Sequence, residues 1–450
     1  MTKDLTNRPN GAVTSDRRTV IKGIGAAATA GAAASVIGAP AVHAQKKQLR
    51  FLNAEPSAAS VEALRVAAAE WEAKTGVEVV IDSVPAGDAF NKLQASIRAG
   101  RPYDVGTLIF LAHVLLLADE GQLVPVTNLI NKHEWGKRIL FPINGEHYWY
   151  MYDYNLCFLN YRTDIYNKLG LPAPTTQDQL LDNIKAITAS DDGTRFGIAH
   201  PIGSNGATNY MSFGYMWANG VSMFDDNWNF TFGNAENLNR TAAFVDYFAE
   251  LYNYIPSGMT QASFGEMISL YVGEQIAHVP YPGRLIDSLE VNNPELANNI
   301  SILPYPSADG DIGAVNHGYD GWVVVDTPMA EESMKFLEWL SEEHYINFLH
   351  TSPIHYQPPR MDVYEDPRWL AHPSIKKHAG VIETMRGFLE RDDIIIRSID
   401  TEGPEPDLRA GKVFETYALA EMLQNKLIRG APTDQVVAEA AAKMRAVLPA

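Results

Sequence analysis

The chain has 450 residues, of which 46% are hydrophobic and 20% charged, and its net charge is −18 at pH 7. A chain of this length suits two or three domains with a large buried core. The acidic balance argues against nucleic acid or an anionic membrane surface as a partner, because both attract basic proteins. Cys157 is the single cysteine in the sequence, which excludes an internal disulfide and any metal site built from several cysteines.

The N-terminus carries the features of an export signal. Arg17 and Arg18 are adjacent, an Ala/Gly-rich run follows over 23–41, and residues 42–44 form a small-residue end that resembles a cleavage site. An arginine pair in this position is typical of a twin-arginine signal. We therefore expect residues 1–44 to be removed during export and the mature protein to act in the periplasm. A retained membrane anchor is less favoured, because Ala and Gly contribute little to membrane transfer.

The first part of the mature chain alternates strands and helices. Apolar and β-branched runs predict strands at 49–54, 77–84 and 104–110. Between them, apolar residues recur at helical spacing over 61–71 and 90–97. Alternation of this kind favours a mostly parallel sheet with helices on both faces. We therefore expect an α/β fold.

A second unit begins after the aromatic stretch at 148–161. Thr176 and Gln179 form a T-x-x-Q capping box, which predicts the start of a helix. The remaining elements are predicted from apolar spacing and β-branched runs. They are helices over 239–254, 262–272, 330–342 and 437–447, and strands over 275–279, 300–303 and 321–325.

Four short segments combine aromatic rings with amide, carboxylate or guanidinium groups. They lie at 148–155, 204–228, 317–322 and 353–360. In the first of them, alternation along a strand places the tyrosines on one face and most of the polar residues on the other. Aromatic rings cover the C–H faces of a sugar or polyol, while planar polar groups fix its hydroxyls. These segments therefore predict a sugar or polyol as the ligand.

Motifs for other chemistry are absent from the sequence. It contains no H-E-x-x-H, G-x-S-x-G, Walker-type phosphate loop or EF-hand loop, and its 12 histidines show no close pairing. We expect no metal ion, no cofactor and no catalytic residue. We expect Cys157 to be a small, buried apolar residue, because no basic partner that would activate its thiol is evident around it.

Ordered landmarks over residues 48–448 resemble one known family. The segment 117–126 (Leu-Ala-Asp-Glu-Gly-Gln-Leu-Val-Pro-Val) is similar to the family's Ala-x-x-Gly-x-Leu-x-Pro-Leu, and 170–176 (Gly-Leu-Pro-Ala-Pro-Thr-Thr) is among its most recognisable runs. The segments 271–277 and 321–325 resemble later landmarks in the same order. The family comprises the extracellular solute-binding proteins of carbohydrate-importing ABC transporters, the group that includes maltose-binding protein.

The resemblance implies a two-lobed periplasmic-binding-protein fold with hinge segments and a central ligand cleft. Proteins of this kind close their lobes around an unchanged ligand, so no enzymatic activity is expected. The implied partition assigns 45–153 and 301–342 to the first lobe, and 154–300 and 343–450 to the second.

The resemblance also implies a set of ligand-binding residues. By position these are Glu55, Pro56, Phe110, Asp153, Asn155, Tyr281, Arg284, Tyr319, Asp320 and Trp322. The aromatic segments add Asn205, Trp217 and Tyr356. The chain departs from the family at 281–284, where Tyr-Pro-Gly-Arg stands near the place of a Gly-Pro-Trp segment and lacks its sugar-stacking tryptophan. Stacking then falls to Tyr281 or moves to another aromatic residue.

The leading interpretation is a monomeric periplasmic receptor that captures a sugar or polyol and delivers it to the permease subunits of an ABC importer. Arg284, Arg101 and Arg360 would also suit a carboxylate or phosphate group. A receptor for an anionic sugar derivative or a glycerol phosphodiester is therefore the first alternative. An exported carbohydrate-active hydrolase is the second, since paired carboxylates near aromatic rings also cleave glycosidic bonds.

Overall fold

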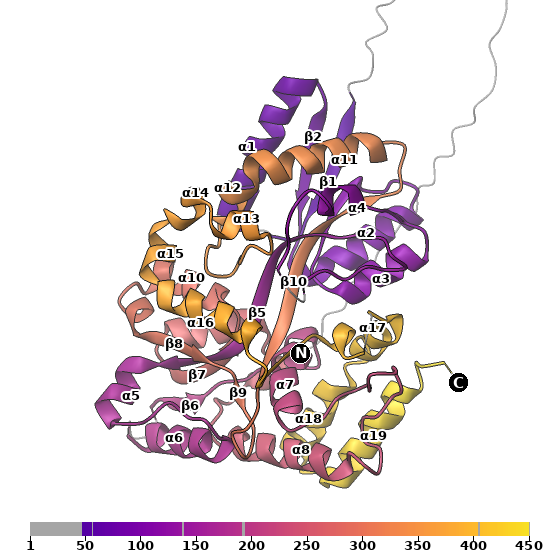
Figure 1. Ribbon diagram of the computed structural model, residues 1–450. Coiled ribbons are helices and arrows are strands. Elements are labelled where there is room, and N and C mark those ends of the chain that lie inside the picture. The colour runs from indigo at the N-terminus through magenta and orange to yellow at the C-terminus, as the bar shows by residue number, and fades with distance from the viewer. Residues whose placement is uncertain (1–46, 56, 137–138, 191–193, 404–405, 450) are drawn as a thin grey trace, which may run out of the picture. The chain divides into compact units, whose positions relative to one another are not determined.

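The computed structural model describes residues 47–449, apart from 56, 137–138, 191–193 and 404–405. The predicted export signal at 1–44 lies outside these residues. The segment Lys46–Ala450 forms one unit, and its elements separate into two lobes that share two long strands (Figure 1).

The first lobe is built on parallel strands. These are β1 (Gln48–Asn53), β2 (Glu78–Ser83) and β3 (Val105–Leu108), with β1 between the other two. Each strand is followed by a helix: α1 (Ala58–Thr75), α2 (Ala89–Arg98) and α3 (Leu111–Asp119). The short β4 (Leu123–Val124) and α4 (Thr127–Ile130) come next. The strand and helix alternation predicted for this part of the chain is confirmed.

Two long strands connect the lobes. β5 (Tyr150–Arg162) and β10 (Gly313–Val325) pair in antiparallel fashion, with residues 150–156 of β5 opposite 317–322 of β10. The C-terminal end of β10 pairs with β3 and β4, and the C-terminal end of β5 pairs with β7 (Ile276–Tyr281) and β8 (Ile300–Leu303). Figure 1 shows both strands running from the indigo first lobe into the second. Each of them therefore belongs to the sheet of both lobes.

The second lobe surrounds the other end of this sheet. Its further strands are β6 (Phe196–Ile198), β9 (Tyr305–Pro306) and β11 (Ile394–Arg397). Its helices up to β8 are α5 (Thr163–Leu169), α6 (Gln177–Ser190), α7 (Gly206–Ala218), α8 (Leu238–Tyr252), α9 (Phe264–Val272) and α10 (Arg284–Asn292). The lobe boundaries stay a prediction, although the pairing of β8 with β5 places Ile300–Leu303 beside second-lobe strands.

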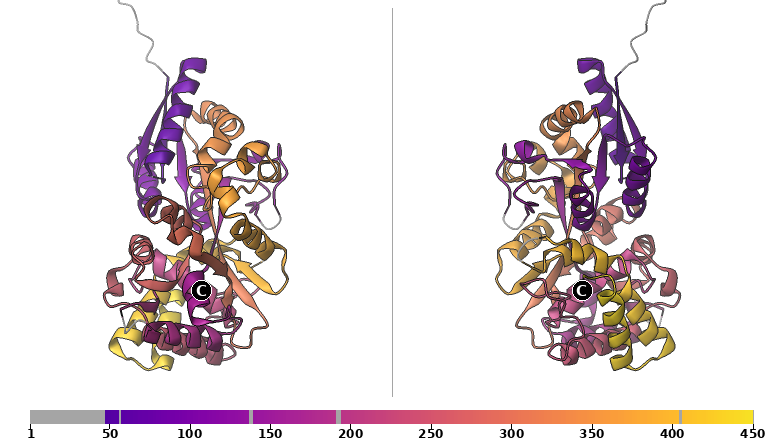
Figure 2. Two further views of the ribbon diagram at one scale, coloured as in Figure 1. Left: turned by 90° about the vertical axis from the view of Figure 1, so that its left-hand side faces the viewer. Right: turned by 90° about the vertical axis from the view of Figure 1, so that its right-hand side faces the viewer.

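The helices after β10 return to both lobes. A π-helical turn (Leu340–His344) and α12 (Tyr345–Leu349) follow α11 (Ala330–Trp339) and pack against α1. Farther on, α16 (Ala379–Glu390) contacts β8 and β11, while α18 (Ala418–Arg429) and α19 (Thr433–Arg445) contact α8. Short helices lie between them: α13 (Met361–Tyr364), α14 (Pro367–Leu370), α15 (Pro373–Lys377) and α17 (Leu408–Phe414). Figure 2 shows, from two sides, the indigo first-lobe elements at one end and the yellow C-terminal helices at the other.

Burial is greatest along the two connecting strands. Every residue of β10 and every residue of β5 except Tyr161 is buried, and the lone thiol of Cys157 is buried among them, as expected. Polar groups removed from water need partners inside the protein. The polar residues of β5 and β10 are therefore the natural starting point for the functional site.

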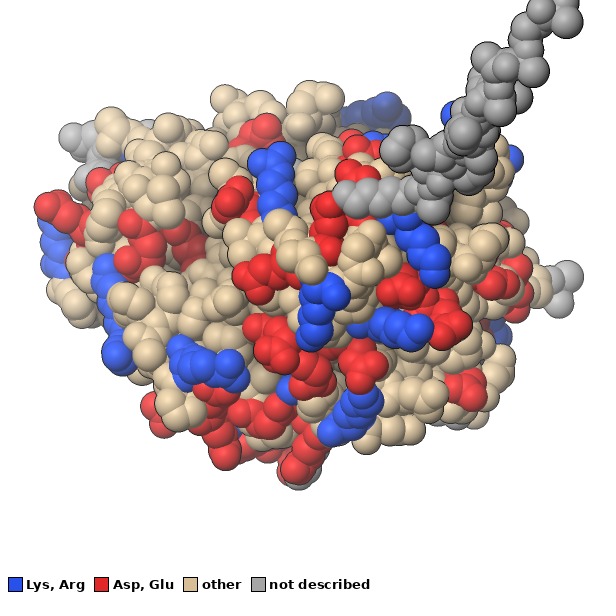
Figure 3. Space-filling model, turned by 90° about the horizontal axis from the view of Figure 1, so that it is seen from above, with Lys and Arg blue, Asp and Glu red and all other residues tan. Residues whose placement is uncertain are grey.

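The surface agrees with the acidic composition. Seen from the first-lobe end, acidic and basic side chains are interspersed, and acidic ones are widespread (Figure 3). In the part of the chain that the structure describes, no helix has the length and apolar character needed to cross a membrane.

Candidate functional site

The candidate site begins where β5 and β10 pair between the lobes. Asp153 faces Asp320 in the ladder, and the register shifts directly after Asp320. Asp153 Oδ1 accepts the backbone N–H of Asp320 at 2.9 Å. The Asn155 amide spans the two carboxylates, since its Nδ2 lies 3.3 Å from Asp320 Oδ2 and 3.5 Å from Asp153 Oδ2. Directly opposed residues of an antiparallel ladder lie side by side on one face of the sheet, which brings the two carboxyl groups close together.

Gly318 allows a second-lobe tyrosine to reach this pair. Tyr210, on α7, donates its hydroxyl hydrogen to Asn155 Oδ1 at 3.1 Å. A Cβ atom at position 318 would lie 2.0 Å from Asn155 Oδ1 and 2.7 Å from the Tyr210 hydroxyl oxygen. No side chain fits there unless both groups move, so the glycine is a requirement of this packing.

A second group of polar side chains comes from the loops after β1 and β7. Glu55 is fixed by Asn53, whose Oδ1 accepts the Glu55 N–H at 3.0 Å. Arg284 begins α10, and its Nη2 donates to Glu55 Oε2 at 2.9 Å. The same nitrogen lies 3.3 Å from the hydroxyl oxygen of Tyr356, whose ring centre is 5.3 Å from the guanidinium carbon. This ion pair joins a first-lobe loop to a second-lobe helix.

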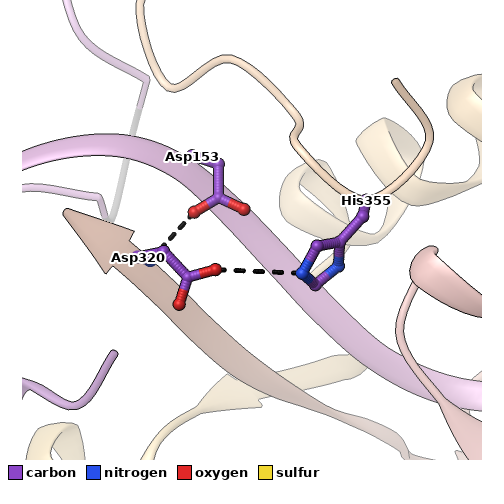
Figure 4. A group of neighbouring side chains, drawn as sticks. All are labelled: Asp153, Asp320 and His355. Atoms are coloured by element: carbon purple, nitrogen blue, oxygen red, sulfur yellow. Dashed lines mark hydrogen bonds and ion pairs between the residues drawn. The ribbon is translucent and has the colours of Figure 1, made fainter. Parts of the chain in front are cut away.

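The loop between α12 and α13 supplies a histidine. Asp287 of α10 holds this loop, because its carboxylate accepts the N–H groups of Ile354 at 3.1 Å and His355 at 3.0 Å, and the Ser352 hydroxyl at 2.7 Å. His355 Nε2 then lies 3.8 Å from Asp320 Oδ2, which is too far for a hydrogen bond. Figure 4 shows the imidazole and the two carboxyl groups in one cluster.

We call these eight residues the polar cluster. They are Glu55, Asp153, Asn155, Tyr210, Arg284, Asp320, His355 and Tyr356. All but Arg284 are at least nine-tenths buried, and the Arg284 side chain is 27% exposed. The cluster therefore collects groups from both lobes in a place largely shielded from water.

Burial controls the protonation of the polar cluster. It raises the pKa of Asp153 and the pKa of Asp320 well above the usual carboxyl range. The negative charge of Asp320 raises the pKa of Asp153 further, and that of Glu55 raises the pKa of Asp320 further. Burial and then the positive charge of Arg284 lower the pKa of His355 well below its ordinary value. Burial disfavours the charge of Arg284, but the Glu55 carboxylate holds the Arg284 pKa above its usual value. The imidazole is thus neutral while the guanidinium stays charged.

The polar cluster can form many hydrogen bonds with a polar ligand. Its carboxyl groups accept, its guanidinium and amide donate, and its tyrosine hydroxyl groups do both. Within the described residues, Asp153, Asp320 and His355 could also hold a metal ion, since one donor atom of each lies within 4.8 Å of the others. The expectation that the protein binds no metal stays a prediction.

The polar cluster brings six of the predicted ligand-binding residues together: Glu55, Asp153, Asn155, Arg284, Asp320 and Tyr356. Tyr210 and His355 were not predicted, although they stand in the aromatic segments 204–228 and 353–360. Both residues reach the cluster because α7 and the loop after α12 lie next to the paired strands β5 and β10. No local sequence pattern predicts this arrangement.

Three further predicted residues are aromatic and lie outside the polar cluster. Tyr319 stacks on His317, with ring centres 3.9 Å apart. Phe110 precedes α3 and contacts Phe414, with ring centres 4.9 Å apart. Tyr281 ends β7 and is buried. Their contact with a ligand remains a prediction.

The other predicted residues are engaged in packing and capping. Trp322 is buried against the rings of Tyr152 and Phe348, and Trp217 Nε1 donates to Glu402 at 2.6 Å. Asn205 caps α7, since its Oδ1 accepts the N–H of Thr208 and its Nδ2 donates to the carbonyl of Ala262. The structure does not bring these three side chains into the polar cluster. Pro56 lies outside the described residues.

Comparison with known families identifies the class of protein. The family model for bacterial extracellular solute-binding proteins matches residues 55–345, and the chain belongs to this family. No curated protein sequence is significantly similar to the chain.

Solved structures of solute-binding proteins share the fold. A protein from Thermotoga lettingae, bound to α-D-tagatose, is 19% identical, with a TM-score of 0.72 and coverage of 90% of this chain and 100% of that one. A protein from Agrobacterium radiobacter, in complex with ribitol, is 17% identical, with a TM-score of 0.69 and coverage of 89% and 98%. Maltose-bound T. maritima MalE3 is 16% identical, with a TM-score of 0.72 and coverage of 89% and 100%. The predicted two-lobed periplasmic-binding-protein fold is confirmed.

Proposed function

We propose that this protein is a periplasmic receptor that binds a sugar or polyol and delivers it to the permease subunits of an ABC importer. The observation that carries the proposal is the polar cluster, because its groups come from both lobes. Ligand binding favours the closed form only through contacts that differ between the open and closed states. A ligand held between Glu55 on one lobe and Arg284 on the other has such contacts.

The chemistry of the polar cluster suits a ligand with many hydroxyl groups. Asp153, Asp320 and Glu55 accept hydrogen bonds, while Arg284 and Asn155 donate them. The Tyr356 hydroxyl group, which lies 3.3 Å from Arg284 Nη2, can donate or accept a further hydrogen bond. The family membership and the tagatose, ribitol and maltose held by structures of the same fold support this ligand class.

The anionic alternative has less support. The three arginines on which it depends are otherwise engaged or exposed: Arg284 pairs with Glu55, Arg360 pairs with Asp362 at 2.6 Å, and Arg101 is exposed on the first lobe. An anion would have to displace a carboxylate to reach Arg284. The hydrolase alternative has no support from the family, whose description and neighbours are those of binding proteins.

The site of action and the partners follow from the same proposal. The family is extracellular by its description, and the twin-arginine sequence at 17–18 supports export to the periplasm. A protein that presents its closed form to permease subunits can act as a monomer, which is the oligomeric state that we propose.

A thermal-shift screen of the purified protein tests the proposal. The panel contains D-tagatose, ribitol, maltose and other monosaccharides, disaccharides and polyols at millimolar concentration. A ligand at about 100 times its dissociation constant stabilises the folded state by about 2.7 kcal/mol, so we expect one stereochemical class to raise the melting temperature by a few degrees. Chromatography should recover that ligand unchanged. No shift with any member, or conversion of a member to products, would contradict the proposal.

A further inference from the structure

The polar cluster holds more carboxyl groups than cations. Glu55, Asp153 and Asp320 supply three carboxyl groups, and Arg284 is the cation whose charge reaches Asp320. Arg284 is already committed, since it donates to Glu55 at 2.9 Å and lies 3.3 Å from the Tyr356 hydroxyl oxygen. One ion pair therefore balances Glu55 and leaves the Asp153–Asp320 pair without a matching positive charge.

His355 does not supply that charge. It is 6% exposed, its Nδ1 has no hydrogen-bond partner among the described residues, and its Nε2 faces Asp320 Oδ2 at 3.8 Å (Figure 4). Burial and the nearby guanidinium keep the imidazole neutral. Nε2, the nitrogen that faces the carboxyl pair, lies beyond hydrogen-bond distance of Asp320 Oδ2. A buried polar group in this position needs a partner, which a ligand beside the carboxyl pair can supply.

Asn155 compensates the negative charge of the Asp153–Asp320 pair only in part. Its Nδ2 reaches both carboxyl groups, at 3.3 Å and 3.5 Å, which are long distances for N–H···O bonds. A neutral amide supplies no charge, and buried carboxylates that lack a counter-charge take up protons instead. The raised pKa values of both aspartates agree with that state. A ligand that carries its own cation would remove the imbalance.

We propose that the ligand of this site carries a protonated amine in addition to its hydroxyl groups, and that Asp153 and Asp320 bind the amine. The inference rests on the proposed sugar or polyol function and narrows it to amino sugars or amino polyols. The ammonium group donates charge-assisted hydrogen bonds to the carboxylates. The hydroxyl groups contact Arg284 and Glu55, and the neutral His355 accepts or donates one further hydrogen bond.

Matched pairs of ligands test the inference by calorimetry on the purified protein. The pairs are D-glucosamine with D-glucose, D-galactosamine with D-galactose, D-mannosamine with D-mannose, and D-glucamine with D-sorbitol. We expect the amine of at least one pair to bind at least about tenfold more tightly than its parent, which corresponds to about 1.4 kcal/mol. Hydroxyl parents that bind as tightly as their amines in every pair would overturn the inference and leave the proposed function standing.

Variants locate the amine. Asp320→Asn and Asp153→Asn keep the shape of the side chain and remove its charge, so each should abolish the preference for the amine while the parent still binds. Asp309→Asn, in the exposed turn where Ser307 bonds to Asp309, is the control and should keep the preference. A preference that survives in both site variants would overturn the assignment to this pair.

Two further probes separate the remaining outcomes. Putrescine has amines and no hydroxyl groups. If it binds while every sugar and polyol fails to bind, the amine site stands and the proposed function is contradicted.

Zn²⁺ or Ca²⁺ alone tests whether the carboxyl pair binds a metal ion instead. A melting shift with either ion that Asp320→Asn removes, together with no amine preference, would assign the pair to a metal and overturn the inference. If no probe binds, both proposals fall.

Discussion

Arg284 and Glu55 are 229 residues apart in the sequence, yet Arg284 Nη2 donates to Glu55 Oε2 at 2.9 Å. Glu55 follows β1 of the first lobe, and Arg284 begins α10 of the second. The Glu55 side chain is 7% exposed and that of Arg284 27% exposed, so water screens the pair little. The ion pair thus links the two lobes, and a ligand held at this place would compete for the hydrogen bonds of both partners.

Glu55→Gln should destabilise the protein. The substitution removes the counter-charge of a mostly buried guanidinium, and breaking such a pair costs more than losing an exposed one. Because Arg284 keeps some exposure, we expect a loss of about 1–3 kcal/mol in the free energy of unfolding, measured by urea denaturation. Glu331→Gln is the control, since Glu331 pairs with Lys335 on an exposed helix face, and it should change stability little. Equal effects of the two substitutions would contradict the role assigned to the pair.

Gly318→Ala should disrupt the site. The new Cβ would lie 2.0 Å from Asn155 Oδ1, so Asn155 and Tyr210 must move, at a cost of about 1–3 kcal/mol. We expect both a lower melting temperature and weaker ligand binding. Gly387→Ala in α16 is the matched control, because a Cβ there meets nothing within 4 Å; it should stabilise the helix by about 0.5–1 kcal/mol. Unchanged binding in Gly318→Ala would place the ligand elsewhere.

Tyr210→Phe should weaken ligand binding about two- to tenfold, because it removes the hydroxyl that positions Asn155 through a 3.1 Å hydrogen bond. The measurement is a calorimetric titration with the strongest ligand from the thermal-shift screen. Tyr215→Phe on the same helix is the control, since the buried Tyr215 hydroxyl has no hydrogen-bond partner among the described residues. A larger effect from Tyr215→Phe than from Tyr210→Phe would contradict this part of the account.

Asp400 should make stability depend on pH. Burial raises the pKa of Asp400 to about 7, above the unfolded value of about 3.9. The folded state therefore binds the Asp400 proton more tightly than the unfolded state does, and this tighter binding adds to the free energy of unfolding. The added stability is fully present below about pH 4 and is lost as pH rises through 7. Asp400→Asn removes it.

Urea denaturation of both proteins between pH 4 and pH 8 measures the effect. The variant should gain about 2–4 kcal/mol relative to the wild type over that range. A constant difference between the two proteins across the range would show that Asp400 has no raised pKa.

Local patterns predicted most elements and only part of the site. The strands near 49–54 and 300–303 and the helix near 239–254 were recognisable because each buries one apolar face or run. The strand near 77–84 was recognisable from its β-branched residues, although the residues of β2 are only half-buried or exposed. The strand predicted at 321–325 instead begins at Gly313. Its first half contains glycines and polar residues, which are unfavourable in an isolated strand and stable here because β5, β9 and β11 pair with it.

The polar cluster shows the same limit. Asp153 and Asn155 were identified from their place in an aromatic strand, but their pairing with Asp320, 165 or more residues away, is a property of the register between two long strands. His355 reaches the cluster because Asp287 holds its loop from another helix. Contacts of this kind depend on tertiary structure, so a single sequence contains no local signal for them.

A calorimetric titration of the wild type and Asp320→Asn, with the ligand that gives the largest thermal shift, tests most directly where the ligand binds. If the polar cluster binds the ligand, the wild type should bind one molecule per chain and Asp320→Asn should bind it at least about tenfold more weakly, a difference of about 1.4 kcal/mol. Equal dissociation constants for the two proteins would show that the ligand lies elsewhere and that the polar cluster is not its binding site.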